Sequence, residues 1–307
     1  MFRSTISHCL FVVAFTLIVA ALVSSTHAQS VQLPGPVVAM VPGSGPDHLY
    51  VLAGQHLLRI DPRSGKTYPL DGQSAGAWPD VKAMAISTTS GKIFIISGTE
   101  LYGVDKGTGV WTARHGQAKG GWPNTMVMYS LWPPSFAETP DDLEGGLYIV
   151  TGNELYHADE WTGNWSGRPG QAKGSWPDVK AMTGIIAKPP VGGLYIISGN
   201  ELYHADPRTG NWSARHGQAK GGWPEVTAMA SAGGRSPDLY IISQNELYHA
   251  EPATGFWSGR PGERAGFWSD ASAMVYHWDN LYIFNNERLY RVDPDSGNWL
   301  LIPLVRG

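Results

Sequence analysis

A block of 23 residues recurs along this chain without insertion or deletion, and it constrains the fold more than any other feature. In one copy Asp206, which ends a Leu-Tyr-His-Ala run, is followed at offsets of 6, 17 and 23 residues by Trp212, Trp223 and Met229. Copies with the same offsets begin at Asp105, Asp159 and Glu251, and a further copy from Asp61 has Thr67 in place of the first tryptophan. Such a repeat predicts stacked, similar units, because one unit of this size cannot bury its apolar face alone.

Six methionines mark the units, at spacings of 44, 44, 54, 47 and 45 residues: Met40, Met84, Met128, Met182, Met229 and Met274. Each unit reads as four short strands; for example, 226–230, 194–198, 201–206 and about 211–215 are rich in Leu, Ile, Tyr and Trp. Gly-Asn and Asp-Pro-x-Thr-Gly segments between them suit tight turns.

Four antiparallel strands per unit, repeated six times with no helical stripe, predict an all-β, six-bladed β-propeller. The blades would span about 35–79, 80–123, 124–177, 178–224, 225–269 and 270–303 of a domain at 29–307. A stacked β-solenoid is the alternative, and the long loop that joins successive units disfavours it.

How the ring closes is left open by the sequence. The first unit begins with an innermost strand and the last ends with an outermost one, so no blade is expected to combine strands from both ends. Residues 31–33 could add an outer strand to the last blade. The longest insert, 131–146, is expected on one face of the ring, where it could dock a protein partner.

Residues 1–28 are predicted to be a cleaved secretory signal. An apolar run at 9–23 is followed by a small-residue pattern ending in Thr-His-Ala, and the run is too short for a comfortable membrane span. Cleavage would remove Cys9, the chain's one cysteine, so no disulfide is expected. A secreted or periplasmic protein follows, with a retained anchor as the alternative and no stable membrane insertion after cleavage. The net charge of −4, without patterning, argues against nucleic acid as a partner.

The segment Asp206-Pro207-Arg208-Thr209-Gly210-Asn211-Trp212 resembles the Asp-Pro-x-Thr-x-x-Trp signature of kelch propellers. The strand expected at 194–198 ends in Ser198-Gly199 rather than the Gly-Gly of kelch repeats. The unit length and short turns also resemble the tachylectin type of sugar-binding propeller, and the Trp spacing partly resembles the quinoprotein repeat. These resemblances cover nearly the whole of 29–307 and imply a propeller; the tachylectin type also implies sugar binding.

The loop between units is the richest in polar groups. An aromatic plane beside Arg, Gln and Lys donors suits a sugar, which has apolar faces and hydroxyl edges. The alternative is structural: the tryptophans wedge between blades and the arginines bond to loop carbonyls. The candidate ligand-binding residues are Arg114, Gln117, Lys119, Trp122, Arg168, Gln171, Lys173, Trp176, Arg215, Gln218, Lys220, Trp223, Arg260 and Trp268.

A second set of oxygen-bearing residues lies four positions before each methionine, where innermost strands begin. A ring would gather them near one mouth of the axial channel, where carboxylate and amide oxygens suit Ca²⁺. The alternative is that they cap turns in solvent, with Lys82 and Lys180 offsetting their charge. The candidate metal ligands are Asp80, Asn124, Asp178, Glu225 and Asp270.

Repeated, near-identical polar loops favour a secreted multivalent binding protein, with carbohydrate preferred as the ligand. The alternatives are a metal-dependent hydrolase or lactonase that uses the axial carboxylates, and a protein-interaction propeller. The sequence shows no Ser-His-Asp arrangement, phosphate-binding loop or metal-binding His pair, and no catalytic residue is assigned.

Overall fold

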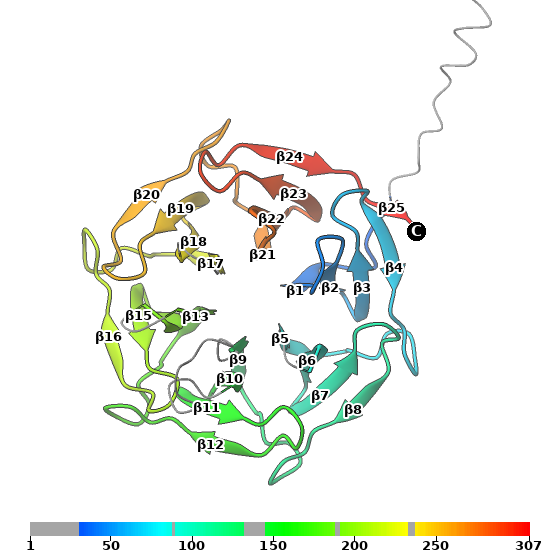
Figure 1. Ribbon diagram of the computed structural model, residues 1–307, viewed down its shortest axis with the longest axis horizontal. Coiled ribbons are helices and arrows are strands. Elements are labelled where there is room, and N and C mark those ends of the chain that lie inside the picture. The colour runs from blue at the N-terminus through cyan, green and yellow to red at the C-terminus, as the bar shows by residue number, and fades with distance from the viewer. Residues whose placement is uncertain (1–30, 88–89, 132–144, 188–190, 233–236) are drawn as a thin grey trace, which may run out of the picture.

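The computed structural model describes residues 31–87, 90–131, 145–187, 191–232 and 237–307. Six sheets stand around a central axis, and every regular element in the described part is a strand (Figure 1). The inner strands are seen nearly end-on and the outer strands lie along the rim, because each sheet twists from its inner to its outer edge. The prediction of a six-bladed β-propeller is confirmed.

Each of six consecutive sequence segments supplies four strands of one blade. Blade 1 contains β1 (Val37–Pro42), β2 (Leu49–Ala53), β3 (His56–Ile60) and β4 (Lys66–Pro69). Blade 2 contains β5 (Val81–Ile86), β6 (Lys92–Ser97), β7 (Glu100–Asp105) and β8 (Trp111–Ala113). Blade 3 contains β9 (Thr125–Leu131), β10 (Gly146–Thr151), β11 (Glu154–Ala158) and β12 (Trp165–Gly167). Blade 4 contains β13 (Val179–Ile185), β14 (Gly193–Ser198), β15 (Glu201–Ala205) and β16 (Trp212–Ala214). Blade 5 contains β17 (Val226–Ala232), β18 (Asp238–Ser243), β19 (Glu246–Ala250) and β20 (Trp257–Gly259). Blade 6 contains β21 (Ala271–His277), β22 (Asn280–Asn285), β23 (Arg288–Val292) and β24 (Trp299–Ile302).

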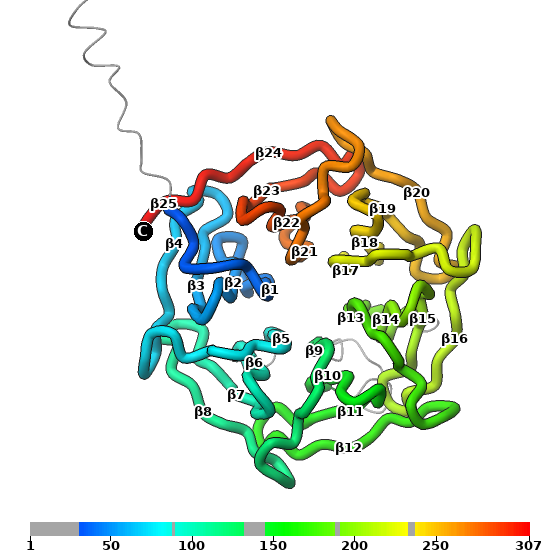
Figure 2. Tube along the Cα trace, turned by 180° about the vertical axis from the view of Figure 1, so that it is seen from behind, coloured from blue at the N-terminus to red at the C-terminus, as the bar shows by residue number. Residues whose placement is uncertain are grey.

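The second strand of each blade carries most of the core. β14 is buried along its whole length, which is expected of a strand covered on both faces by neighbouring blades. The apolar clusters therefore lie between blades: one contains Val150 of blade 3 and Ile196 of blade 4 with the loop residue Trp176. Segments that lead from an outer strand to the next inner strand, such as that between β4 and β5, cross from the rim toward the axis (Figure 2).

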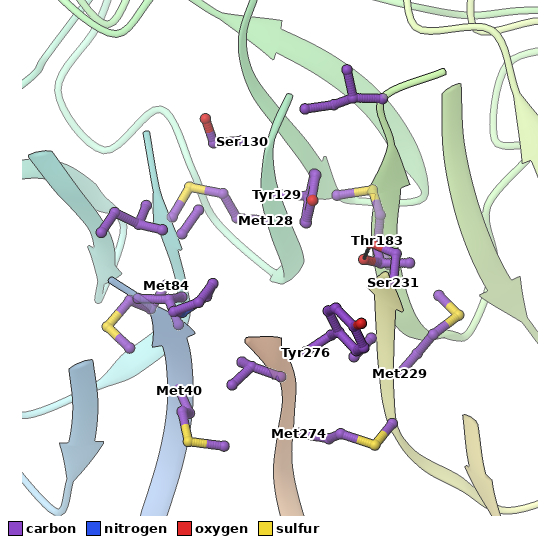
Figure 3. Close-up of a pocket in the computed structure, with 18 residues that line it drawn as sticks. Met40, Met84, Met128, Tyr129, Ser130, Thr183, Met229, Ser231, Met274 and Tyr276 are labelled. Carbon is purple, nitrogen blue, oxygen red and sulfur yellow. Dashed lines mark hydrogen bonds between the residues drawn. The ribbon is translucent and has the colours of Figure 1, made fainter. Parts of the chain in front are cut away.

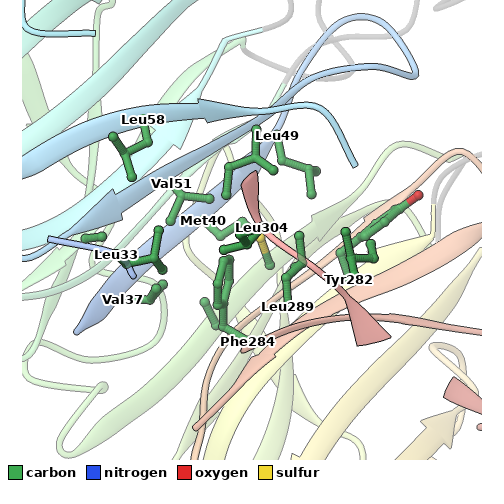
Figure 4. Close-up of a cluster of buried hydrophobic side chains, with 14 of the residues drawn as sticks. Leu33, Val37, Met40, Leu49, Val51, Leu58, Tyr282, Phe284, Leu289 and Leu304 are labelled. Atoms are coloured by element: carbon green, nitrogen blue, oxygen red, sulfur yellow. The ribbon is translucent and has the colours of Figure 1, made fainter. Parts of the chain in front are cut away.

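A two-residue strand closes the ring. β25 (Val305–Arg306) pairs in parallel with β4, and the Val305 backbone N–H donates to the Gly65 carbonyl at 2.9 Å. Leu304 is buried beside Leu33 in an apolar cluster that joins blades 1 and 6 (Figure 4). The expectation that no blade combines strands from both ends is therefore wrong: blade 1 has five strands, and the fifth follows blade 6.

Residues 31–33 do not form an extra strand of the last blade. The Val31 backbone N–H instead donates to the Leu304 carbonyl at 2.8 Å, and Leu33 is buried in the closure cluster. The predicted signal segment 1–28 and positions 132–144 of the long insert lie outside the described residues. No helix in the described part is both long and apolar enough to span a membrane.

Candidate functional site

The four loop tryptophans predicted to bind a ligand are wedged between blades. Trp176 follows blade 3 and contacts Tyr203 and Trp212 of blade 4 edge-on, with ring centroids 5.8 and 6.1 Å apart. Its exposed fraction is 2%, so neither face of the indole is open to a sugar. The structure places these side chains in blade-to-blade packing, which is the alternative role. Equally buried are Trp122, Trp223 and Trp268.

The loop glutamines latch one blade to the next. The side-chain amide of Gln171 donates to the Trp212 carbonyl at 2.5 Å and accepts from the Trp212 N–H at 2.9 Å. An amide carries one donor and one acceptor side by side, as the backbone does, so it pairs with a strand edge. Gln117 with Trp165 and Gln218 with Trp257 form the same pair of bonds.

Replacing Gln171 by alanine is expected to lower the free energy of unfolding by about 1–2 kcal/mol, because two hydrogen bonds across a blade junction are lost at an exposed site. Urea denaturation measures the change. Gln32→Ala, at an exposed glutamine in no blade, is the control and should stay within about 0.5 kcal/mol of the unsubstituted protein. Equal effects of the two substitutions would contradict a latch.

Loop arginines bond to their own outer strands and, at Arg168 and Arg260, also to a turn carbonyl of the next blade, whereas the lysines remain exposed. Arg168 donates to the Ser166 hydroxyl at 2.7 Å and to the Pro207 carbonyl at 3.3 Å, and Arg260 makes the equivalent bonds. Arg215 donates to Ser213 at 2.9 Å. Arg114 occupies the same half-buried place, and Lys119, Lys173 and Lys220 are the exposed donors.

The residues predicted to hold Ca²⁺ are not assembled into a metal site. Asp80 pairs with Lys82 at 2.7 Å, and Asp178 pairs with Lys180 at 2.6 Å. Among the residues the structure describes, no three His, Cys, Asp or Glu side chains lie close enough to hold a metal ion. Left-handed backbone at Asn124, Asp178 and Glu225 shows instead that these positions form the turns before inner strands, and Glu225 and Asp270 are likewise exposed.

The methionines form a girdle around the axial channel. All six are 6–8% exposed, and each lines the channel space on both sides of the girdle. Residues that precede them, such as Val38 and Lys82, line a vestibule of about 190 Å³. Residues that follow them line a chamber of about 200 Å³, hereafter the axial chamber.

One side of the axial chamber is polar. The Tyr129 hydroxyl donates to the Gly184 carbonyl at 3.1 Å, the Ser231 hydroxyl donates to the same carbonyl at 2.8 Å, and the Thr183 and Ser231 hydroxyls lie 2.9 Å apart. Figure 3 shows these side chains and Tyr276 on one side, with Met84 and Met40 opposite. Gly184 is required here, because a Cβ would lie 2.6 Å from the Tyr129 ring.

A buried carboxylate accepts a hydrogen bond from a further hydroxyl of the axial chamber. Glu160 lies in the turn between β11 and β12 and is 7% exposed. It accepts from the Ser87 hydroxyl at 2.6 Å and from the Ser130 hydroxyl at 3.2 Å, and Ser130 lines the axial chamber. Sequence reasoning missed Glu160. The available signal was its place in the repeat, directly after the acid that starts each 23-residue block. Four other copies have proline there and one has lysine: Pro62, Pro207, Pro252, Pro294 and Lys106.

The fold and channel define a member of the β-propeller class. No known protein-family model matches the sequence, and no curated protein matches it. Solved structures do resemble it: a chain of the nidogen/laminin complex has 9% identity and a TM-score of 0.61, covering 82% of this chain and 91% of its own. An auxiliary nutrient binding protein from Bacteroides thetaiotaomicron has 14% identity and a TM-score of 0.58, covering 87% of this chain and 68% of its own. Virginiamycin B lyase from Staphylococcus aureus has 12% identity and a TM-score of 0.54, covering 90% of this chain and 88% of its own. At these identities the likeness shows the fold alone.

Proposed function

We propose that this protein is an exported binding propeller that holds a small molecule in the axial chamber. The observation that carries the proposal is the chamber's division into two unlike sides. Val41, Ala85 and Ile86 supply apolar surface from blades 1 and 2, whereas hydroxyl groups come from blades 3 to 6. Concave sites with an apolar lining and a few placed polar groups are typical of small-molecule binding.

The contrast between the chamber and the outer loops supports this location. The blade junctions repeat the same tryptophan and glutamine contacts, as packing requires of every blade. The chamber residues differ in nearly every blade. Two places after five of the methionines, the lining residues are Pro42, Ile86, Ser130, Ser231 and Tyr276.

Export is proposed from the signal-like segment 1–28. Similar solved structures include the extracellular domain of a two-component system from B. thetaiotaomicron and PorZ, a bacterial surface component of a secretion system in Porphyromonas gingivalis. Those locations belong to those proteins and support the proposal by analogy of fold. Mass spectrometry of the exported protein, with a mature N-terminus at residue 29 as the expected result, tests it.

Blocking the chamber tests the binding proposal. Small molecules of up to about ten heavy atoms are screened by ligand-observed NMR, and hits are measured again on Ile86→Trp, which places an indole on the apolar side of the axial chamber. We expect at least a tenfold loss of affinity because the substituted side chain occupies the site. Val38→Trp, on the vestibule side, is the matched control and should change affinity less than twofold. Hits unaffected by Ile86→Trp, or no hits, would contradict the proposal.

A second candidate is multivalent binding of carbohydrate or protein by the rim. His115 lies 3.0 Å from Glu100, and His216 lies 3.0 Å from Glu201, each in a loop that also exposes a lysine. Repeated groups of this kind raise avidity for clustered ligands. A glycan array tests it, and Lys119→Ala with Lys220→Ala should weaken any array signal. The hydrolase alternative is not proposed, because no three His, Cys, Asp or Glu side chains of the described residues lie close enough to hold the metal it requires.

A further inference from the structure

Building on the proposed binding function, we infer that the axial chamber selects an organic ammonium ion: an apolar body that carries a positively charged N–H donor. Among the lining residues that the structure describes, the side-chain hydroxyls can accept hydrogen bonds, and each of their protons is already donated within the protein. This assignment goes beyond the existence of the site, because a chamber of the same shape with free hydroxyl protons would also take carboxylates and neutral acceptors.

The hydroxyl protons can be assigned one by one. Carbonyl oxygens only accept, so Tyr129 and Ser231 each donate to the Gly184 carbonyl. Ser231 has one proton, which is used there, so Thr183 must donate in the 2.9 Å bond between the two side chains. Each of these three oxygens is thereby left with lone pairs only.

Glu160 determines where the hydroxyl proton of Ser130, the fourth of these groups, points. A carboxylate accepts and does not donate, so the Ser130 proton points to Glu160 and the Ser130 lone pairs remain for the chamber. The Ser87 bond holds the other carboxylate oxygen at 2.6 Å. Only the Ser130 hydroxyl separates the negative charge of Glu160 from the chamber. Because Glu160 is buried, water screens this charge little.

Tyr276 completes the set at the edge of the chamber. Its hydroxyl donates to the Asp279 carboxylate at 3.2 Å. Desolvation, followed by the charges of Asp279, Asp238 and Asp295, raises the pKa of Tyr276 to about 12. The carboxylates of Asp279, Asp238 and Asp295, which contribute to this rise, also attract a nearby cation, whereas desolvation, its largest cause, opposes a buried charge of either sign.

The remaining lining suits the body of such a ligand. None of the described lining residues is Lys, Arg or His, so no fixed positive charge opposes an ammonium ion. The methionine girdle supplies polarisable thioethers that adapt to irregular shapes. The chamber volume of about 200 Å³ exceeds the roughly 150 Å³ of a cavity known to hold benzene, so a single ring with a short arm fits.

Three probes of one shape test the inference: benzylammonium, benzyl alcohol and benzoate, each titrated by ligand-observed NMR at neutral pH. We expect benzylammonium to bind at least tenfold more tightly than benzyl alcohol, the size of one charge-assisted hydrogen bond. Benzoate should show no binding at ten times the benzylammonium dissociation constant. Alcohol binding as tightly as ammonium, tighter benzoate binding, or no binding of any probe would overturn the inference.

Variants connect the selectivity to the assigned protons. Glu160→Gln removes the charge and can donate to Ser130, so ammonium affinity should fall about tenfold while alcohol affinity changes less than twofold. If Glu160→Gln proves unstable, Ser130→Ala should weaken the ammonium severalfold, with the exposed vestibule residue Ser272→Ala as its control. Equal losses for both probes would overturn the inference.

The two proposals fail separately. If Ile86→Trp abolishes binding of alcohol and ammonium but the probes bind equally well, the chamber is the site and the donor assignment is wrong. If ammonium binds preferentially and Ile86→Trp leaves its affinity unchanged, the ion is bound by surface carboxylates and both proposals are overturned.

Discussion

Replacing Trp176 by alanine is expected to lower the free energy of unfolding by about 4 kcal/mol. The indole is 2% exposed and contacts Tyr203 and Trp212 of the next blade. Its removal loses the burial of the indole ring and leaves a cavity between two blades. The hydrogen bonds within each blade keep its strands in place, so the cavity closes only in part. Urea denaturation followed by circular dichroism measures the loss.

Trp161→Ala is the matched control. Trp161 belongs to the same blade and is 58% exposed, so its removal should cost less than about 1 kcal/mol. A similar cost for both tryptophans would contradict the wedge. Loss of ligand binding by Trp176→Ala with no loss of stability would instead restore the sugar-binding interpretation of the loop.

Truncation after Pro303 is expected to destabilise the ring by about 5 kcal/mol. Loss of the buried Leu304 side chain costs roughly 2–5 kcal/mol, and each hydrogen bond that β25 makes with blade 1 contributes about 1 kcal/mol more. Blade 6 would then be joined to blade 1 by side-chain packing alone, without the strand pairing. Thermal unfolding at matched concentration detects the change.

Leu301→Ala controls for the loss of apolar surface near the end of the chain. Leu301 lies in β24, adjacent to the closing segment, but is 41% exposed. We expect a loss below about 1 kcal/mol. A truncated protein as stable as Leu301→Ala would show that the ring is closed by packing between blades 1 and 6 alone.

The repeated elements of the fold could be predicted from the sequence because each is encoded several times. The strands expected at 194–198, 201–206 and 226–230 correspond to β14, β15 and β17 within two residues at every end. Periodic apolar residues and turn glycines act locally, so they identify strands without knowledge of their neighbours. Ring closure has no such repetition: β25 has two residues, and its partner lies at the other end of the chain.

The candidate sites were harder to predict, because the repeats conceal what differs. The loop residues Trp176 and Gln171 look like a binding set and are a blade junction, since both packing and multivalent binding produce repetition. Asp80 and Asp178 lie before inner strands, as expected, but each pairs with a lysine, and no metal-sized group of three His, Cys, Asp or Glu side chains forms among the described residues. Glu160 was visible only as a departure from the repeat.

The pairing of β25 with β4 also sets the order in which the protein can be completed during synthesis. Thr67 and its partner Val305 are 238 residues apart, so the first blade made is the last one finished. At about 5–20 residues per second, its outer edge stays unpaired for roughly 10–50 seconds. An unpaired edge offers its backbone groups to any passing strand. Nascent chains are therefore most exposed to misassociation at their oldest blade, and pairing of β25 with β4 ends that exposure.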